Sequence, residues 1–306
     1  STSGFEKLDK STSYLFISNH RDIILDTSLL NACLYEKGLF MTTSAIGDNL
    51  IQKPFLKHLS RLTRNFVIKR GLPARELLES SKLVSSYIRH SLLRENRSVW
   101  IAQREGRTKD GNDQTHKGVL KMISMAADPK ENFLDYFQRL NVVPVSISYE
   151  YDPTDILKMP ELLAKARQET YVKGENEDFK TLLSGIIGQK KRIHIHIGDI
   201  LTDGIEKIKK DVSGQVKQLQ ALADLIDEQI ILGYKLWPTK YIAHDLLMNS
   251  DQFASEYTPE QKALFEARFR RGVDQNDETA IKSYLSMYAN PVINQKKIME
   301  EMKGIT

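Results

Sequence analysis

A histidine with two nearby acids follows the first predicted strand of the chain. The run Ile17-Ser18-Asn19-His20-Arg21-Asp22-Ile23-Ile24-Leu25-Asp26 places His20 directly after an apolar segment and before a helical pattern. Imidazole takes up a proton near neutral pH, and a carboxylate partner fixes its tautomer and stabilises the imidazolium that forms. His20 is therefore a candidate general base, with Asp22 and Asp26 as possible partners. Asp22 is also well placed to cap the following helix.

Two basic clusters come after later predicted strands. One is Val67-Ile68-Lys69-Arg70-Gly71, and the other is Gln103-Arg104-Glu105-Gly106-Arg107-Thr108-Lys109. A guanidinium group can hold a phosphate through two parallel hydrogen bonds, and glycine permits close approach of the backbone to a ligand. The candidate substrate-binding residues are Lys69, Arg70, Glu105, Gly106, Arg107 and Lys109. Taken singly, either cluster is also compatible with a plain charged loop.

The elements that must position these clusters alternate in type through the first two thirds of the chain. The predicted strands are Tyr14–Ser18, Phe40–Thr43, Asn65–Lys69, Ser98–Ala102, Val142–Tyr149 and Arg192–Gly198. The predicted helices are Ile23–Tyr35, Asp48–Thr63, Pro73–Leu93, Gly118–Ala127, Asp155–Arg167 and Phe179–Gly188. This alternation predicts an α/β fold, a mixed β-sheet flanked by helices, with active groups on loops at the strand ends.

The strand pattern stops after Gly204. Helices are predicted there at Ile205–Gly233, Pro238–Met248, Pro259–Arg270, Glu278–Tyr288 and Pro291–Lys303. We therefore expect an α/β domain over residues 1–204 and a helical C-terminal region over residues 205–306 that packs on it.

The composition is that of an ordinary globular protein. Apolar residues make up 41% and charged residues 27% of the sequence, which excludes disordered and collagen-like classes. No run of 18 apolar residues occurs, so no spanning helix is expected. The single cysteine, Cys33, cannot form an internal disulfide and fits a reducing compartment.

The net charge of +4 is mild, but the positive charge is unevenly distributed. Helical spacing gathers four basic residues on one side of a predicted helix, Lys53, Lys57, Arg61 and Arg64. Its other side carries Ile51, Phe55, Leu59 and Leu62. Such a basic amphipathic helix is either a solvated face over a core face, or a surface for anionic lipid headgroups and phosphorylated substrates. Nucleic-acid binding is not expected, because the basic side of this helix carries no aromatic residues and the overall charge is modest.

In their order along the chain, the clusters resemble the four motif blocks of the glycerol-3-phosphate and lysophosphatidate acyltransferase family. Asn19-His20 is similar to the start of the first block, and Val67-Ile68-Lys69-Arg70 to the second. Glu105-Gly106-Arg107 is similar to the third, and Val143-Pro144-Val145 to the fourth. The resemblance covers residues 14 to 150.

This resemblance implies an α/β acyltransferase in which the motif histidine deprotonates the acceptor hydroxyl and the motif aspartate orients that histidine. The arginine and Glu-Gly blocks hold the acceptor phosphate and glycerol. The activated oxygen attacks the acyl thioester directly, without a covalent acyl-enzyme. The donor is acyl-CoA or acyl carrier protein, an apolar groove receives the acyl chain, and neither a metal nor another cofactor takes part.

Two departures from the family pattern affect the site residues. Five residues separate His20 from Asp26, whereas the family has four between its histidine and aspartate. One extra residue turns a helical side chain by about 100°, so only a loop or bulge can preserve the pair. Asp26 is favoured as the partner, with Asp22 as the alternative. The third block also lacks the family's proline, which leaves Arg70 and Arg107 as the leading phosphate ligands and Lys69 and Lys109 behind them.

The resulting hypothesis is an enzyme of phospholipid biosynthesis, peripheral at the cytoplasmic face of the membrane. It transfers an acyl group to glycerol-3-phosphate or a lysophospholipid, and its partners are the acyl carrier, the acceptor and an anionic membrane surface. One alternative is a non-catalytic lipid- or phosphate-binding protein on the same fold, because the His-Asp spacing is altered. Another is an acyltransferase whose acceptor is an acylated amino acid.

Overall fold

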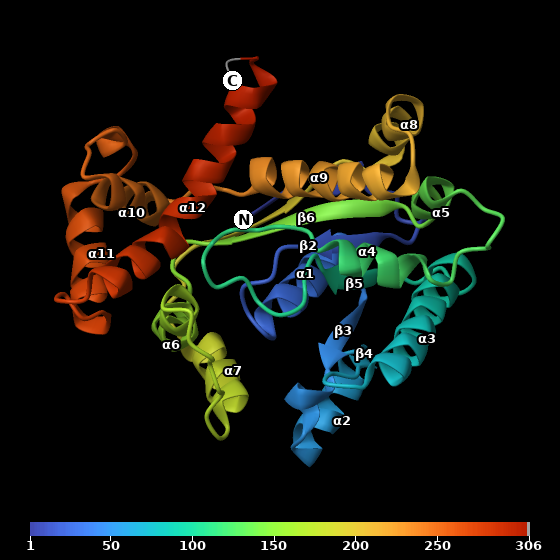
Figure 1. Ribbon diagram of the computed structural model, residues 1–306, viewed down its shortest axis with the longest axis horizontal. Helices are drawn as coiled ribbons and strands as arrows, with labels where there is room; N and C mark the ends of the chain where they lie inside the picture. The colour runs from blue at the N-terminus through green and yellow to red at the C-terminus, as the bar shows by residue number, and fades with distance from the viewer. Residues whose placement is uncertain (305–306) are drawn as a thin grey trace.

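A seven-stranded sheet forms the centre of the computed structural model, which describes residues 1–304 (Figure 1). The strands are β1 (Thr2–Ser3), β2 (Leu15–Ser18), β3 (Thr43–Gly47), β4 (Asn65–Ile68), β5 (Val99–Ala102), β6 (Val142–Tyr149) and β7 (Ile193–Ile197). Their order across the sheet is β1-β7-β6-β2-β5-β3-β4. Every neighbouring pair is parallel except β6 and β7, which are antiparallel. The predicted α/β fold with a mixed, helix-flanked sheet is confirmed.

Twelve α-helices and three short 3-10 helices lie within the described residues. They are η1 (Phe5–Lys7), α1 (Leu25–Glu36), η2 (Asp48–Ile51), α2 (Pro54–Leu62), α3 (Ala74–Leu93), α4 (Lys117–Ser124), α5 (Phe133–Arg139), α6 (Asp155–Ala166), α7 (Glu177–Ile187), α8 (Thr202–Asp211), α9 (Gln215–Gly233), α10 (Pro238–Met248), η3 (Ala254–Glu256), α11 (Pro259–Gly272) and α12 (Glu278–Met302).

Both faces of the sheet are buried, because side chains of each strand alternate between them. Leu15 and Ile17 of β2 join a core with α3, α4, α5, α8 and α9. Phe16, between them, joins a second core with α1 and η1. Figure 1 shows α9 lying along β6 on the first of these faces. Continuous apolar strands of this kind are typical of a sheet covered on both sides.

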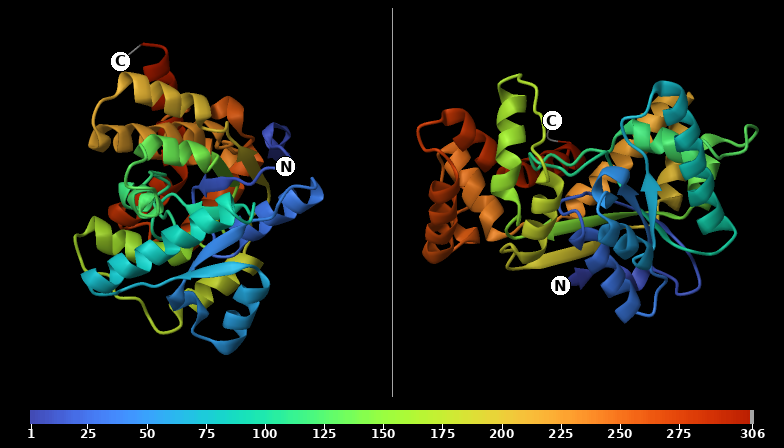
Figure 2. Two further views of the ribbon diagram at one scale, coloured as in Figure 1. Left: turned by 90° about the vertical axis from the view of Figure 1, so that its right-hand side faces the viewer. Right: turned by 90° about the horizontal axis from the view of Figure 1, so that it is seen from below.

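The C-terminal helices build a separate apolar core at one end of the sheet. Residues of α6, α10, α11 and α12 form it, with the aromatic rings of Phe265, Tyr284 and Tyr288 in contact. Figures 1 and 2 show this helical group at the opposite end of the molecule from α3. α6 follows β6 directly, so the loop between them joins the sheet to the helical core.

Two predictions for the C-terminal region were wrong in detail. The single helix expected over 205–233 is two helices, α8 and α9, because Gly214 takes a φ of 89° between them. The two helices expected on either side of Pro291 are one, α12. Proline cannot donate to the carbonyl of Met287, and Gly111 packs so closely there that an added Cβ would lie 2.2 Å from that oxygen. The loop that contains Gly111 therefore covers the turn of α12 in which the proline removes a backbone hydrogen bond.

Elsewhere the predicted strands and α-helices match the structure closely, with four exceptions. The strand expected at Phe40–Thr43 begins only at Thr43, the helix expected at Asp48–Thr63 is the two elements η2 and α2, and β1 and α5 were not predicted. The domain division at residue 204 stays a prediction: Gly204 lies inside α8, and both α8 and α9 share the core of the sheet. None of the helices within residues 1–304 combines the length and the apolar character that a bilayer span requires.

Candidate active site

Parallel strands bring the sequence clusters to one edge of the sheet. β2, β3, β4, β5 and β6 run in the same direction, so their carboxyl ends lie along a common edge. His20 follows β2, Lys69 and Arg70 follow β4, and the Gln103–Lys109 loop follows β5. Ligands of open α/β sheets bind at this edge. Clusters that are far apart in the sequence therefore meet in space.

His20 and Asp26 form a hydrogen-bonded pair at this edge. Nδ1 of His20 lies 2.8 Å from Oδ2 of Asp26, whose side chain is completely buried. An ionised carboxylate only accepts hydrogen bonds, so Nδ1 carries the proton and Nε2 presents its lone pair. The imidazole packs edge-on against Trp100, with ring centroids 5.4 Å apart. This is the arrangement of a general base with an orienting acid.

Four donors satisfy the buried carboxylate of Asp26. Besides His20, the backbone N–H groups of Arg21 and Asp22 donate to Oδ2 over 2.7 and 3.0 Å. The hydroxyl of Tyr149 donates to Oδ1 over 2.7 Å. Burial, and next the charge of Asp26, hold the pKa of Tyr149 well above its ordinary value, so this hydroxyl keeps its proton. The four hydrogen bonds fix the carboxylate in one orientation toward His20.

Asp22 has a different place in the structure. Its Oδ1 accepts from the backbone N–H groups of Ile24 and Leu25 at the start of α1. Burial, and next the neighbouring Asp26, raise the pKa of Asp22. α7 packs against it so closely that a Cβ at Gly185 would lie 2.2 Å from Oδ2. The structure thus pairs His20 with Asp26 and uses Asp22 as a helix cap.

The extra residue between His20 and Asp26 is absorbed before the helix starts. α1 begins at Leu25, which puts Asp26 in its first turn, and the residues from His20 to Ile24 form a loop. Asn19 anchors the beginning of this loop to β6, since its side chain exchanges hydrogen bonds with the backbone of Ile147. The pair is therefore set by the path of the loop and not by helical periodicity.

A cavity of about 950 Å³ lies beside His20. Its polar wall includes Lys69, Arg70, Arg104, Glu105 and Gly106. Arg70 is 3.8 Å from Glu105 between Nε and Oε1, and both are solvent-accessible. The volume falls within the usual range for small-molecule sites, about 300–1,000 Å³. The second and third clusters thus meet His20 at one cavity.

The rest of the cavity wall is largely apolar. Residues of the loop from His20 to Ile24, hereafter the catalytic loop, and of α2, α3 and α4 contribute to it: Ile24, Leu56, Leu59, Leu62, Leu77 and Met122. The apolar side of the basic helix α2 therefore faces the cavity. Leu59 and Leu62 are also exposed to solvent, at 44% and 81%, so they lie where the cavity meets the surface.

Arg107 and Lys109 are directed elsewhere. Arg107 donates to the hydroxyl of Thr154 over 3.3 Å, and Nζ of Lys109 lies 2.6 Å from the carboxylate of Glu161 on α6. Among the described residues, the cavity wall does not include either of them. They connect the third cluster to the helical core.

Sequence reasoning had missed two residues of the site. Tyr149 was assigned only to the predicted strand Val142–Tyr149, although a hydroxyl at the carboxyl end of a buried strand was the available signal. Arg104 lies in the third cluster but was not singled out, and it is the cation of that cluster that lines the cavity.

Residues 2–148 match the family described as Acyltransferase. This segment of the chain is an acyltransferase domain. The matched segment ends inside β6 and contains His20, Asp26 and the cavity cations, whereas Tyr149 follows directly after it. None of the curated proteins matches the chain.

One solved structure that resembles this acyltransferase is the 1-acyl-sn-glycerophosphate (LPA) acyltransferase PlsC from Thermotoga maritima. The two share 13% identity, and the match covers 70% of this chain and 73% of the other, with a TM-score of 0.30. That overlap is too weak for a residue-by-residue correspondence. The protein is an enzyme that transfers acyl groups. The roles of its residues are therefore argued from the geometry of its own site.

Proposed function

We propose that the enzyme transfers a fatty acyl group from acyl-CoA or acyl carrier protein to a hydroxyl of glycerol-3-phosphate or a lysophospholipid. One observation carries the proposal: His20, backed by the buried Asp26, shares a cavity with Lys69, Arg70 and a long apolar wall. A cation pair suits the phosphate of the acceptor, and the apolar wall suits the acyl chain.

In the proposed mechanism, Nε2 of His20 removes the proton of the acceptor hydroxyl as its oxygen attacks the thioester carbonyl. Asp26 stabilises the imidazolium that forms. The carbonyl then reforms, the thiolate of the acyl carrier leaves, and the imidazolium returns the proton to it. The oxygen of the acceptor thus forms the new ester bond while the thioester bond breaks.

Direct attack is preferred to an acyl-enzyme because Cys33 is a poor nucleophile here. It packs against the core under α1, and burial, followed by the charge of Glu36, raises the pKa of its thiol. Reactive cysteines have the opposite property, a lowered pKa that favours the thiolate.

α2 supports placement of the enzyme at an anionic membrane surface. Lys57, Arg61 and Arg64 are exposed around it, beside Leu62 at the edge of the cavity. Basic and apolar residues together on one exposed helix favour binding at the lipid interface. In this position, an acyl chain could pass between the membrane and the cavity without crossing water.

A panel of donors and acceptors tests the proposal. Purified enzyme is incubated with labelled acyl-CoA or acyl carrier protein and with glycerol-3-phosphate, lysophosphatidate, a lysophospholipid or an acylated amino acid. We expect product from at least one donor with phosphate-bearing acceptors, and no label on the protein after acid quenching. Transfer confined to acceptors that lack phosphate would contradict the acceptor assignment, and a labelled protein would contradict direct attack.

A further inference from the structure

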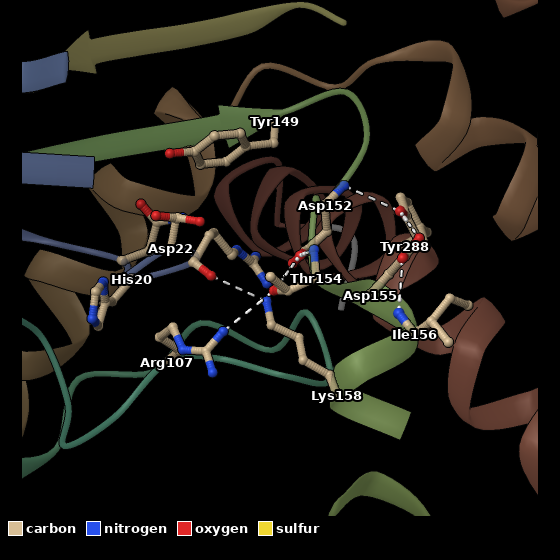
Figure 3. A network of polar contacts seen from close by, with 12 residues as sticks. His20, Asp22, Arg107, Tyr149, Asp152, Thr154, Asp155, Ile156, Lys158 and Tyr288 are labelled. Carbon is tan, nitrogen blue, oxygen red and sulfur yellow. Dashed lines mark hydrogen bonds and ion pairs between the residues drawn. The ribbon is translucent and has the colours of Figure 1, made fainter. Parts of the chain in front are cut away.

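A buried lysine outside the acyltransferase match reaches the loop that carries His20. Lys158 lies on α6 and is only 2% exposed. Its ammonium group donates to the carboxylate of Asp152 and, over 3.2 Å, to the backbone carbonyl of Arg21 (Figure 3). A buried ammonium needs such partners, because desolvation of an unpaired charge is very costly.

The carbonyl that Lys158 contacts belongs to the same peptide unit as an N–H that holds Asp26. The peptide between residues 21 and 22 presents the oxygen of Arg21 to Lys158 and the N–H of Asp22 to Oδ2 of Asp26, over 3.0 Å. The unit is planar and rigid, so fixing its oxygen also fixes its N–H. A cation at the oxygen also polarises the amide and strengthens the hydrogen bond that the N–H donates.

We propose that Lys158 is a positioning residue for acyl transfer, acting on the His20–Asp26 pair through the peptide between residues 21 and 22. The sequence of contacts runs from Lys158 through this peptide to Asp26 and then to Nδ1 of His20. The inference rests on the proposed function, since it assigns His20 the role of base.

The C-terminal helices hold Lys158 in place. Tyr288 of α12 accepts a hydrogen bond from the backbone N–H of Asp152 over 3.1 Å and donates to Asp155 over 2.7 Å. Arg268 of α11 makes two charged hydrogen bonds to the carboxylate of Asp155, at 2.8 and 2.7 Å. Figure 3 shows Tyr288 close to Asp152 and Asp155. The helical region thereby contributes to a site whose reacting groups all lie in the N-terminal half.

A stabilising role alone does not explain why the group is charged. A buried ion pair is often no more stabilising than apolar residues of the same volume. Burial lowers the pKa of Lys158, and Asp152 is the main group that opposes this shift. The feature that a stabilising role leaves unexplained is the ammonium group directed at the backbone carbonyl of Arg21.

The test compares Lys158→Met with Lys240→Met. Lys240 of α10 is an equally buried lysine, 3% exposed, whose ammonium donates to the carbonyl of Glu150 over 3.4 Å and lies over the ring of Tyr288. We expect Lys158→Met to lower kcat by about 10- to 100-fold, the scale of one charge-assisted hydrogen bond, with KM for both substrates unchanged. Lys240→Met should keep kcat close to that of the wild type.

A double variant and a spectroscopic measurement keep the test decisive if Lys158→Met does not fold. The double variant Lys158→Met with Asp152→Asn removes both charges. Its asparagine keeps a side-chain oxygen for the N–H of Thr154, which donates to Asp152 over 2.9 Å in the wild type. We expect the same loss of kcat. Nitrogen-15 NMR of His20 should show the Nδ1-protonated tautomer in the wild type and in Lys240→Met, and a tautomer mixture without the lysine.

Three results would overturn the inference alone: a wild-type kcat in the folded double variant, a loss no larger than that of Lys240→Met, or an unchanged tautomer of His20. His20→Ala separates this failure from a failure of the proposed function. If His20→Ala is inactive while the lysine variants keep kcat, only the inference is wrong; if His20→Ala keeps full turnover, both are wrong.

Discussion

Exchange of Asp22 and of Asp26 for the corresponding amides distinguishes the roles of the two acids. Asp26→Asn removes the negative charge next to His20 but keeps the size of the side chain and an oxygen for the two backbone N–H groups. Asp22→Asn keeps the oxygen that caps α1 and accepts from Ile24 and Leu25. Both replacements should leave the fold intact, so differences in rate report on chemistry.

The size of the effect follows from the geometry of the pair. Nδ1 and Oδ2 are 2.8 Å apart and the carboxylate is fully buried, which places the two charge centres about 4 Å apart. At an effective dielectric constant of about 20, the imidazolium then gains about 4 kcal/mol from Asp26. This attraction exists only once the proton has moved, so its loss should lower kcat by about 10³-fold. Asp22→Asn should cost less than about tenfold, because its hydrogen bonds persist.

Steady-state transfer of labelled acyl groups at saturating acceptor measures both variants, and circular dichroism with thermal melting verifies that they are folded. The expected order is a large loss for Asp26→Asn and a small one for Asp22→Asn. The reverse order would show that the pairing of His20 with Asp26 is not the catalytic one and would transfer the role to Asp22.

Four further results are expected. Tyr149→Phe removes one hydrogen bond to the carboxylate of Asp26 and should lower kcat by about 10- to 100-fold with KM unchanged. A kcat equal to that of the wild type would refute this role of Tyr149. Arg70→Ala should raise KM for a phosphorylated acceptor far more than Lys109→Ala, which removes only an ion pair to α6, and equal effects would count against the cavity assignment. Burial raises the pKa of Asp227 to about 7, so its ionisation costs stability as pH rises from about 4 to 7. Asp227→Asn should therefore unfold like the wild type at pH 4 and be more stable above pH 7, which urea titrations at each pH measure. Finally, the enzyme should bind anionic vesicles less tightly as salt increases, and Arg61→Glu should weaken binding further; salt-independent binding to neutral vesicles would contradict the role of α2.

The strands and the edge on which the site lies could be predicted from sequence, because apolar runs and polar strand ends are local patterns. β6 was predicted at its observed bounds, and the clusters after β2, β4 and β5 meet at one cavity. The path of a loop is not local. Only the structure shows that the residues between His20 and Asp26 turn so that one extra residue is accommodated.

Contacts between segments that are distant in the sequence could not be predicted either. Pro291 predicts a break, but the packing of Gly111 against the turn lets α12 continue. The sequence does not distinguish Lys158 from other helical lysines, because its contact with the catalytic loop depends on how α6 packs. Arg107 and Lys109 match a phosphate-binding pattern, yet their side chains reach residues of the β6–α6 segment. In each case tertiary packing decides between alternatives that the pattern leaves equal.

The central claim is that His20 acts as the base of acyl transfer. Its most direct test is the initial rate of labelled acyl transfer to a phosphate-bearing acceptor by His20→Ala and the wild type, both verified as folded. Loss of a positioned general base should reduce the rate by about 10²–10⁴-fold. Undiminished turnover in His20→Ala would contradict the mechanism.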